Sequence, residues 1–113
     1  MARTPEEVFA HHGKALGAED LEEILTDYTD ESVLVVNRQV YRGVEGARVV
    51  FTRLLADVPQ ARWDLVTTFA DDVLHLEWRA TSQERHVPDG VDTFVFANGF
   101  IRVQTVRYTL LPV

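Results

Sequence analysis

Residues 89–110 read DGVDTFVFANGFIRVQTVRYTL. In the first half, Asp92, Phe94 and Phe96 alternate with Thr93 and Val95, as side chains do along a strand. The pair Asn98-Gly99, typical of a tight hairpin turn, comes next, and a second β-rich run follows it. The pattern predicts two long strands joined by this turn. Period-two alternation places Asp92 on the same face as Phe94 and Phe96, where an ionised carboxylate is costly to bury without partners. Asp92 is therefore the first candidate for a functional residue.

The composition of the whole chain is that of one globular domain. The chain has 113 residues, of which 46% are hydrophobic, enough for one substantial core and too few for two ordinary domains. We therefore expect a single domain over residues 1–113. The absence of cysteine excludes disulfides and thiolate chemistry. No apolar run is long enough to span a membrane and the charged start does not resemble a secretory signal, so we expect a cytoplasmic protein.

The charge balance argues against two classes of partner. Eighteen acidic residues against 11 basic ones give a formal net charge of −7, and the basic residues do not cluster. A phosphate backbone or an anionic lipid surface would be repelled by such a chain. We therefore expect neither nucleic acid nor a membrane as a partner.

A helix is predicted near the start of the chain. Thr4 and Glu7 have the spacing of a capping box, and the helix is expected to run to about Leu16. His12 falls within its apolar stripe, whereas His11 points away from it. Adjacent residues diverge by about 100° around a helix, so the histidine pair does not predict a metal site. We expect no bound metal.

Two further helices are expected before residue 60. Residues 20–25 predict a short helix with a capped start, and residues 44–58 a longer one at clean helical spacing, stopped by a proline. The acidic residues Asp27, Asp30 and Glu31 are interpreted as a solvated turn, because they lack the spacing and the glycine of a calcium loop.

The remaining segments predict strands. Residues 32–37 form a continuous β-branched run, as expected of a strand covered on both faces, with a turn or bulge at Asn37-Arg38. Residues 62–69 and 73–82 follow as strands, the second with one apolar and one polar face, and residues 83–90 are interpreted as a loop at an opening. The order predicts an α+β fold in which the helices cover one side of a mostly antiparallel, curved sheet.

Several segments together resemble a known family. GAEDLEEIL, TDESVLVV, YRGVEGARVVFTRLL and the closing GVDTFVFANGFIRVQTVRYTL resemble the nuclear transport factor 2-like superfamily, in its SnoaL-like branch, over nearly the whole chain. The resemblance implies a cone-shaped fold whose bent sheet wraps around a pocket closed by the helices, and dimerisation through the outer sheet face. Ketosteroid isomerases, polyketide cyclases and limonene epoxide hydrolase share this fold, so the fold does not choose the reaction.

Carrying over the isomerase pattern gives roles for individual residues. His12 falls where those enzymes place a tyrosine that donates to the substrate oxyanion, and Asp92 falls where they place a protonated aspartic acid, the second donor. Their general base corresponds to Val36, which cannot move a proton, and the neighbouring Asn37 is polar but not basic. The resemblance therefore argues against ordinary ketosteroid isomerisation.

The catalytic residues of the hydrolase and of the cyclases give two further patterns. The hydrolase's Arg-x-Asp pair has no match around residues 77–79. The cyclase branch is similar in using an acidic residue and a histidine near the pocket, which Asp92 with His12 or His86 could supply, although His75 and His86 are expected at the surface. A purely structural reading stays open: His12 could donate to a backbone carbonyl, and Asp92 could accept from Trp78 or a backbone group.

The sequence thus predicts a small protein with one mainly apolar pocket. The candidate catalytic residues are Asp92 and His12, and the candidate substrate-binding residues are Trp78, Phe94, Phe96, Gln104, Tyr108, Asn37 and Phe51. The first hypothesis is an acid–base isomerase or cyclase, without a cofactor, for a compact apolar carbonyl compound. The alternative is a non-catalytic module that binds a small apolar molecule or serves dimerisation. Under either hypothesis we expect a homodimer formed through the sheet face.

Overall fold

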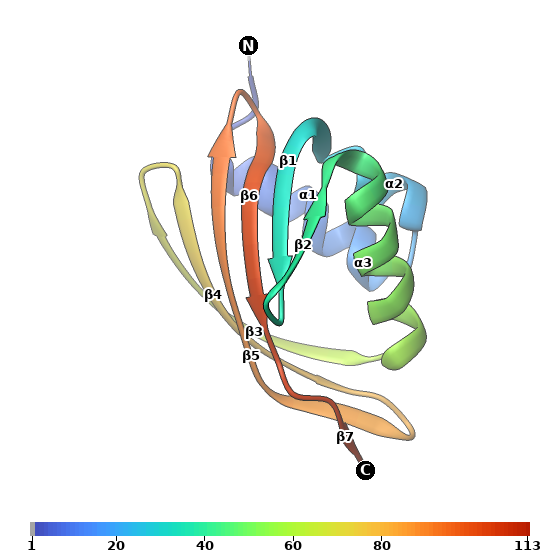
Figure 1. Ribbon diagram of the computed structural model, residues 1–113. Coiled ribbons are helices and arrows are strands. Elements are labelled where there is room, and N and C mark those ends of the chain that lie inside the picture. Colours follow the sequence, from blue (N-terminus) through green and yellow to red (C-terminus); the bar gives the residue numbers. More distant parts are fainter. Residues whose placement is uncertain (1) are drawn as a thin grey trace.

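The computed structural model describes residues 2–113. It contains three helices in the first half of the chain and seven strands (Figure 1). The elements are α1 (Pro5–Gly17), α2 (Leu21–Leu25), β1 (Tyr28–Val36), β2 (Gln39–Arg42), α3 (Gly43–Asp57), β3 (Arg62–Ala70), β4 (Val73–Thr81), β5 (Arg85–Ala97), β6 (Phe100–Arg107) and β7 (Leu111–Pro112).

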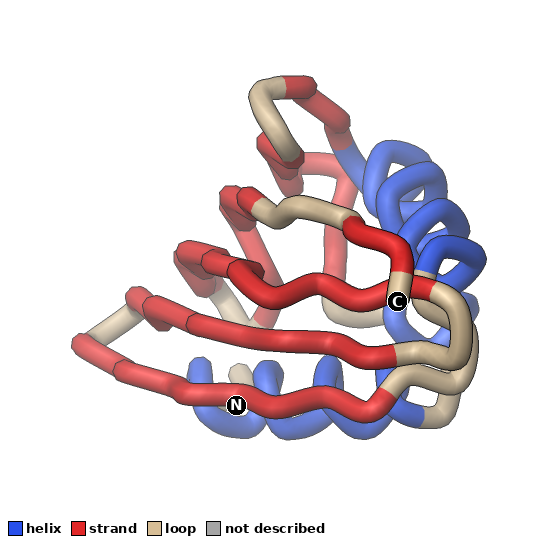
Figure 2. The backbone as a smooth tube through the Cα atoms, turned by 90° about the horizontal axis from the view of Figure 1, so that it is seen from below, coloured by secondary structure: helices blue, strands red, loops and turns tan. Residues whose placement is uncertain are grey.

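One curved sheet contains all the strands. Its order is β2-β1-β6-β5-β4-β3, with β7 paired to β5 beside it. The pairing of β1 with β6 is parallel and the others are antiparallel, in agreement with the predicted mostly antiparallel sheet. The long strands β3, β4 and β5 bend so that the sheet curls around the helices, which all lie on its inner side (Figures 1 and 2). The predicted α+β cone is confirmed.

The core fills the space between the helices and the inner face of the sheet. In β4 every second side chain is buried, from Leu74 to Ala80, and the intervening ones are exposed. Helix α3 contributes Ala47, Val50, Phe51 and Leu54 at helical spacing. The buried side chains of the strands, which recur every two residues, and those of the helices, which recur every 3.6, therefore pack against each other in one core layer.

Local sequence signals fix the turns. Thr4 and Glu7 form the complete capping box at the start of α1. Asn37 and Arg38, both at positive φ, make the tight turn between β1 and β2. Asn98 and Gly99, also at positive φ, join β5 to β6, which confirms the predicted closing hairpin.

Two predicted loops are wrong. The acidic segment after α2 is not a turn, because β1 begins at Tyr28 and takes in Asp30 and Glu31. These two acids are exposed, as predicted, whereas Asp27 is fully buried. Most of residues 83–90 belongs to β5, which begins at Arg85 and pairs with both β4 and β7. Pro88 lies where the β4–β5 register shifts, and a residue without an N–H is tolerated at such an irregularity.

Within residues 2–113, no helix is long and apolar enough to cross a membrane.

Candidate functional site

A small cavity lies between the helices and the bent part of the sheet. Its volume is about 40 Å³, room for at most a few water molecules. The wall is almost entirely apolar. Its residues are Phe9, His12, Gly13 and Leu16 from α1, Val50, Phe51 and Leu54 from α3, and Val36, Trp63, Leu65, Leu76, Trp78, Asp92, Gln104, Val106 and Tyr108 from the sheet side.

Asp92 is the one carboxyl group on this wall among the residues that the structure describes. It projects inward from β5 and is only 5% exposed. The indole N–H of Trp78 donates to its Oδ1 over 2.8 Å, and the side-chain N–H of Gln104 donates to its Oδ2 over 3.0 Å. Both oxygens are therefore held by neutral donors from the neighbouring strands β4 and β6.

Gln104 continues this hydrogen-bonded chain to β1. The hydroxyl of Tyr28 donates to Oε1 of Gln104 over 2.5 Å, and both side chains are buried. Trp78, Asp92, Gln104 and Tyr28 thus connect four strands through one polar network inside an apolar core. Such a network stabilises a single arrangement when every member is satisfied.

Burial dominates the acidity of Asp92. Loss of hydration raises the pKa of its carboxyl from 3.8 to about 7, and the hydrogen bonds from Trp78 and Gln104 offset part of that rise. The group can therefore exist in both protonation states near neutral pH, which is the property that a general acid or base requires.

His12 faces the same cavity from α1 and is 3% exposed. Its ring packs edge-on against Phe51, Phe94 and Tyr28, with ring centroids 5.4–6.2 Å apart. Nδ1 has no hydrogen-bond partner within residues 2–113. Burial lowers the pKa of the imidazole from 6.5 to about 4, so the ring is neutral at pH 7.

His12 and Asp92 are not bonded to each other. The hydrogen-bond partners of Asp92 are Trp78 and Gln104, and the two candidate catalytic residues therefore share the cavity without forming a direct acid–base pair. The structural interpretation of Asp92, in which its carboxyl accepts a hydrogen bond from Trp78, is confirmed. The other structural reading, in which His12 donates to a backbone carbonyl, does not hold for its Nδ1 atom.

Trp78 is closely packed on several sides. It lies between Trp63 and Tyr108, with both ring pairs 5.5 Å apart. Gly90, its cross-strand partner, lies against the indole so closely that an added Cβ would be 2.2 Å from the ring. Glycine at this position lets the indole reach Asp92.

The structure places the predicted site residues in two groups. His12, Phe51, Trp78, Asp92, Gln104 and Tyr108 lie on the cavity wall, as does Val36, which corresponds to the isomerase base. Phe94, Phe96 and Asn37 do not line the cavity. The two phenylalanines stack on each other 5.8 Å apart in the core, and Asn37 lies in the exposed turn after β1, where its Oδ1 accepts from the Tyr108 N–H.

Sequence reasoning missed other wall residues, Leu16 and Trp63 among them, and the position of the opening, whereas Tyr108 was predicted. Leu16, Trp63 and Tyr108 are half-buried at the cavity, so the wall reaches solvent between α1, β3 and the end of β6. His86, considered near the mouth, pairs with β4 and β7 and does not line the cavity. Trp63 could have been found from the alternation of residues 62–69, which places it on the inner face.

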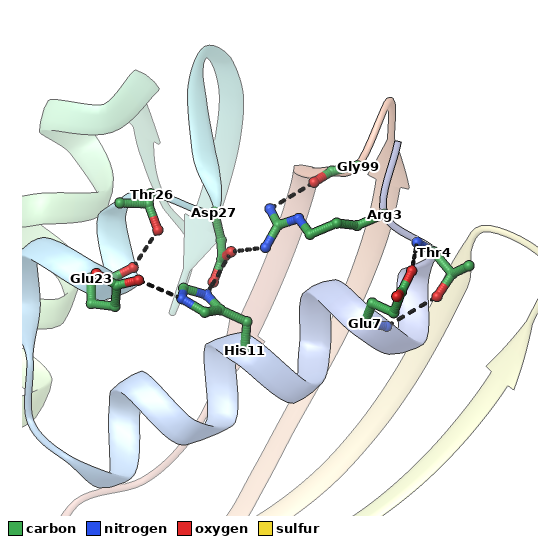
Figure 3. A network of polar contacts seen from close by, with 8 residues as sticks. All are labelled: Arg3, Thr4, Glu7, His11, Glu23, Thr26, Asp27 and Gly99. Carbon is green, nitrogen blue, oxygen red and sulfur yellow. Dashed lines mark hydrogen bonds and ion pairs between the residues drawn. The ribbon is translucent and has the colours of Figure 1, made fainter. Parts of the chain in front are cut away.

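A second buried polar cluster lies outside the cavity, where α1 meets the start of β1 (Figure 3). The Asp27 carboxylate accepts from Arg3 over 2.9 Å and from Nδ1 of His11 over 2.7 Å, while Nε2 of His11 faces Glu23 over 2.7 Å. Carboxylates on both ring nitrogens raise the pKa of His11, Asp27 being the larger influence. His11 was expected only to point away from the apolar stripe.

Metal-binding geometry is not found in the described part of the chain, where no group of three or more His, Asp or Glu side chains could hold an ion.

Several solved structures share this fold. An NTF-2 like protein of unknown function from Burkholderia xenovorans LB400 superposes with a TM-score of 0.76 at 14% identity, covering 93% of this chain and 82% of that one. A proposed SnoaL-like polyketide cyclase from Shewanella denitrificans OS-217 superposes with a TM-score of 0.74 at 13% identity, with 93% and 90% covered.

A de novo designed protein with a curved β-sheet is also similar, with a TM-score of 0.80 at 15% identity and 96% and 88% of the two chains covered. Identities this low show the fold alone, and a fold does not by itself imply a reaction. No curated protein matches the sequence. The SnoaL-like domain family, however, matches residues 8–104, which include most of α1 and the four residues Tyr28, Trp78, Asp92 and Gln104. The chain belongs to the SnoaL-like domain family.

Proposed function

We propose that the cavity binds a compact, largely apolar carbonyl compound and that Asp92 moves a proton on it, as in an isomerase or a cyclase that needs no cofactor. The observation that carries the proposal is Asp92 itself: a buried carboxyl on an apolar wall, with both oxygens held in place and with burial raising its pKa to about 7. Buried acids with such shifts cluster at functional sites.

The chemistry divides between two side chains. In its carboxylate form Asp92 takes the proton from the carbon next to the carbonyl group, and in its protonated form it returns the proton to another position. The carbonyl oxygen gains negative charge in the first step. The neutral imidazole of His12, which can carry one N–H and has no partner at Nδ1, is suited to donate a hydrogen bond to that oxygen.

The size and lining of the cavity support a neutral, compact substrate. No Lys or Arg side chain is among its described wall residues, so nothing there would offset the charge of an anionic ligand. The volume of about 40 Å³ must increase for any organic ligand, and the wall has partly exposed side chains that can move, among them Leu16, Trp63 and Tyr108.

Exchange of carbon-bound protons tests the reaction directly. 2-Tetralone, a small apolar ketone with acidic α-protons, would be incubated with the protein in D2O and followed by proton NMR. We expect faster α-proton exchange with the wild type, and a loss of about 100-fold or more in Asp92→Asn, since a positioned general base contributes roughly that much. Asp64→Asn, which changes an exposed acid on β3, is the matched control.

Val36 at the base position favours a second candidate, a non-catalytic module that binds the same class of molecule. A thermal shift distinguishes the two, because a ligand at 100 times its dissociation constant stabilises the fold by about 2.7 kcal/mol whether or not it reacts. Stabilisation without exchange would support the binding module. Neither stabilisation nor exchange, with 2-tetralone or with smaller cyclic ketones, would contradict both candidates.

A further inference from the structure

The side-chain amide of Gln104 is held at both ends. Its Oε1 accepts from the hydroxyl of Tyr28 at 2.5 Å, and its Nε2 donates to Oδ2 of Asp92 at 3.0 Å. All three side chains are buried, at 4%, 2% and 5% exposure in the order Tyr28, Gln104, Asp92. A primary amide has one accepting end and one donating end, so a donor fixed at the oxygen leaves the N–H groups for the carboxyl.

We propose that Tyr28 is a positioning residue for Asp92: by donating to Oε1 of Gln104 it fixes the amide with its N–H toward Oδ2, and so favours the carboxylate form of Asp92. Tyr28 does not line the cavity and acts only through Gln104. The proposal rests on the function proposed above, in which Asp92 is the group that transfers the proton.

The orientation of the amide selects the charge state of Asp92. With the N–H toward the carboxyl, the ionised form accepts a hydrogen bond that replaces part of its lost hydration. With the amide reversed, Oε1 would face Oδ2, which repels a carboxylate and suits only a protonated acid that donates. The hydroxyl of Tyr28 opposes that reversal, because its buried proton would lose Oε1, its hydrogen-bond acceptor in the described part of the chain. Burial and the nearby charges of Asp92 and Asp27 raise the pKa of Tyr28 well above 10, so the hydroxyl keeps this proton.

The other titratable groups around Asp92 do not change charge near neutral pH. On the α1 side His12, whose pKa is lowered to about 4, is neutral at pH 7. At the end of β6, burial raises the pKa of Tyr108, which therefore stays protonated as well. The partners from β4 and β6, Trp78 and Gln104, do not titrate. A titration of the Asp92 carboxyl near pH 7 would therefore report on its own hydrogen bonds.

The test is a ¹³C NMR titration of the Asp92 carboxyl in the ligand-free protein. The wild type would be compared with Tyr28→Phe, Gln104→Met and the double variant. We expect the pKa of Asp92 to rise by about one pH unit in Gln104→Met, the size expected for loss of one hydrogen bond to a charged group, and to rise less in Tyr28→Phe. Tyr41→Phe, on β2 and bonded to Gln39 and Arg53, is the matched control and should leave the value unchanged.

The double variant decides the route. If Tyr28 acts through Gln104, removing its hydroxyl has no further effect once the amide is gone, so the double variant should titrate like Gln104→Met. An unchanged pKa in Tyr28→Phe, or an equal effect of that substitution in both backgrounds, would overturn the proposal. Should Tyr28→Phe not fold, the wild type supplies the readout: the Gln104 amide resonances must titrate together with Asp92, and amide resonances that ignore this titration would overturn it.

Because the titration needs no substrate, the two proposals can fail separately. A shifted titration in Tyr28→Phe together with no α-proton exchange would contradict only the proton transfer by Asp92. Exchange that depends on Asp92, together with an unmoved titration, would contradict only the role of Tyr28.

Discussion

His12 and Asp92 face one cavity from opposite layers of the fold, and burial shifts their pKa values in opposite directions, to about 4 for His12 and to about 7 for Asp92. Between these values both side chains are largely uncharged in the folded protein. In the unfolded chain, by contrast, they return to ordinary values of 6.5 and 3.8. The two groups therefore make the free energy of unfolding depend on pH with opposite slopes.

The first prediction separates these slopes. The stability contribution of Asp92, whose folded pKa is raised, is complete below about pH 4 and is lost as pH rises through about 7. That of His12, whose folded pKa is lowered, is present above about pH 6.5 and is lost as pH falls to about 4. Between pH 4.5 and 6.5, the free energy of unfolding of Asp92→Asn should therefore rise with pH relative to that of the wild type, and that of His12→Phe should fall. Each difference should change by up to about 1.4 kcal/mol per pH unit.

Urea unfolding followed by tryptophan fluorescence at four pH values measures both variants. His75→Phe, which replaces an exposed histidine on β4, is the control and should follow the wild type. Parallel curves for wild type, Asp92→Asn and His12→Phe would show that neither group has a shifted pKa.

The second prediction concerns Asp27, which is fully buried and holds both Arg3 and His11 (Figure 3). Asp27→Asn should lower the free energy of unfolding by about 3 kcal/mol, because removing one partner leaves charged groups without their counterpart. Glu23→Gln, which changes the exposed acid on the other ring nitrogen of His11, should cost less than about 1 kcal/mol. If chemical denaturation gave the same loss in free energy of unfolding for both substitutions, the burial of Asp27 would add nothing to the strength of its ion pairs.

The same cluster gives a pH dependence. Carboxylates raise the pKa of His11, so its stabilisation is complete below about pH 6.5 and is lost as pH rises through the folded value. Asp27→Asn should therefore lose less stability than the wild type on going from pH 6 to pH 9.

Asp27 also shows where sequence reasoning stops. The acidic pattern from Asp27 to Glu31 looks solvated because its partners are distant: Arg3 and His11 precede it, and the Asp27 carbonyl accepts from the N–H of Ile101. For the same reason the sequence did not show that the strand begins at Tyr28, four residues before the predicted start at residue 32. Long-range partners of this kind leave no local periodicity.

The closing hairpin, in contrast, was predictable because its signals are local. Alternation and the Asn98-Gly99 turn gave both strands and the inward direction of Asp92. Periodicity assigns a face but not a depth along the strand, and so it grouped Phe94 and Phe96 with Asp92 although the cavity lies only at the Asp92 end.

The third prediction tests the close contact between Gly90 and Trp78. An added Cβ would lie 2.2 Å from the indole, so Gly90→Ala must displace Trp78 and weaken its hydrogen bond to Asp92. We expect a loss of about 1–3 kcal/mol from overpacking and a further rise in the pKa of Asp92, because a donor to the carboxylate is lost. Gly17→Ala, at the end of α1 with nothing within 4 Å of the new Cβ, is the control and should not destabilise. Unchanged tryptophan fluorescence and stability in Gly90→Ala would contradict the packing described here.

The fourth prediction concerns the outer face of the sheet, opposite the helices. Val66 and Val91 lie in one cross-strand row with Glu77 and Arg107 and are 62% and 40% exposed. Exposed apolar side chains that lie near one another on an uncovered sheet face can supply the apolar centre of an interface. We propose that two copies pair through this face, with the valines at the centre and the charges of Glu77 and Arg107 available for contacts across it.

Light scattering should then give twice the monomer mass for the wild type. The double variant Val66→Lys with Val91→Lys should give the monomer, because buried lysines without partners oppose association. Val49→Lys changes an equally exposed valine on α3, away from the sheet, and should leave the dimer intact. A wild type that is monomeric at working concentration would refute the pairing. If the double lysine variant is still a dimer, the interface lies elsewhere on the molecule. Val66 and Val91 would then be ordinary surface residues, since isolated exposed apolar side chains are common on proteins.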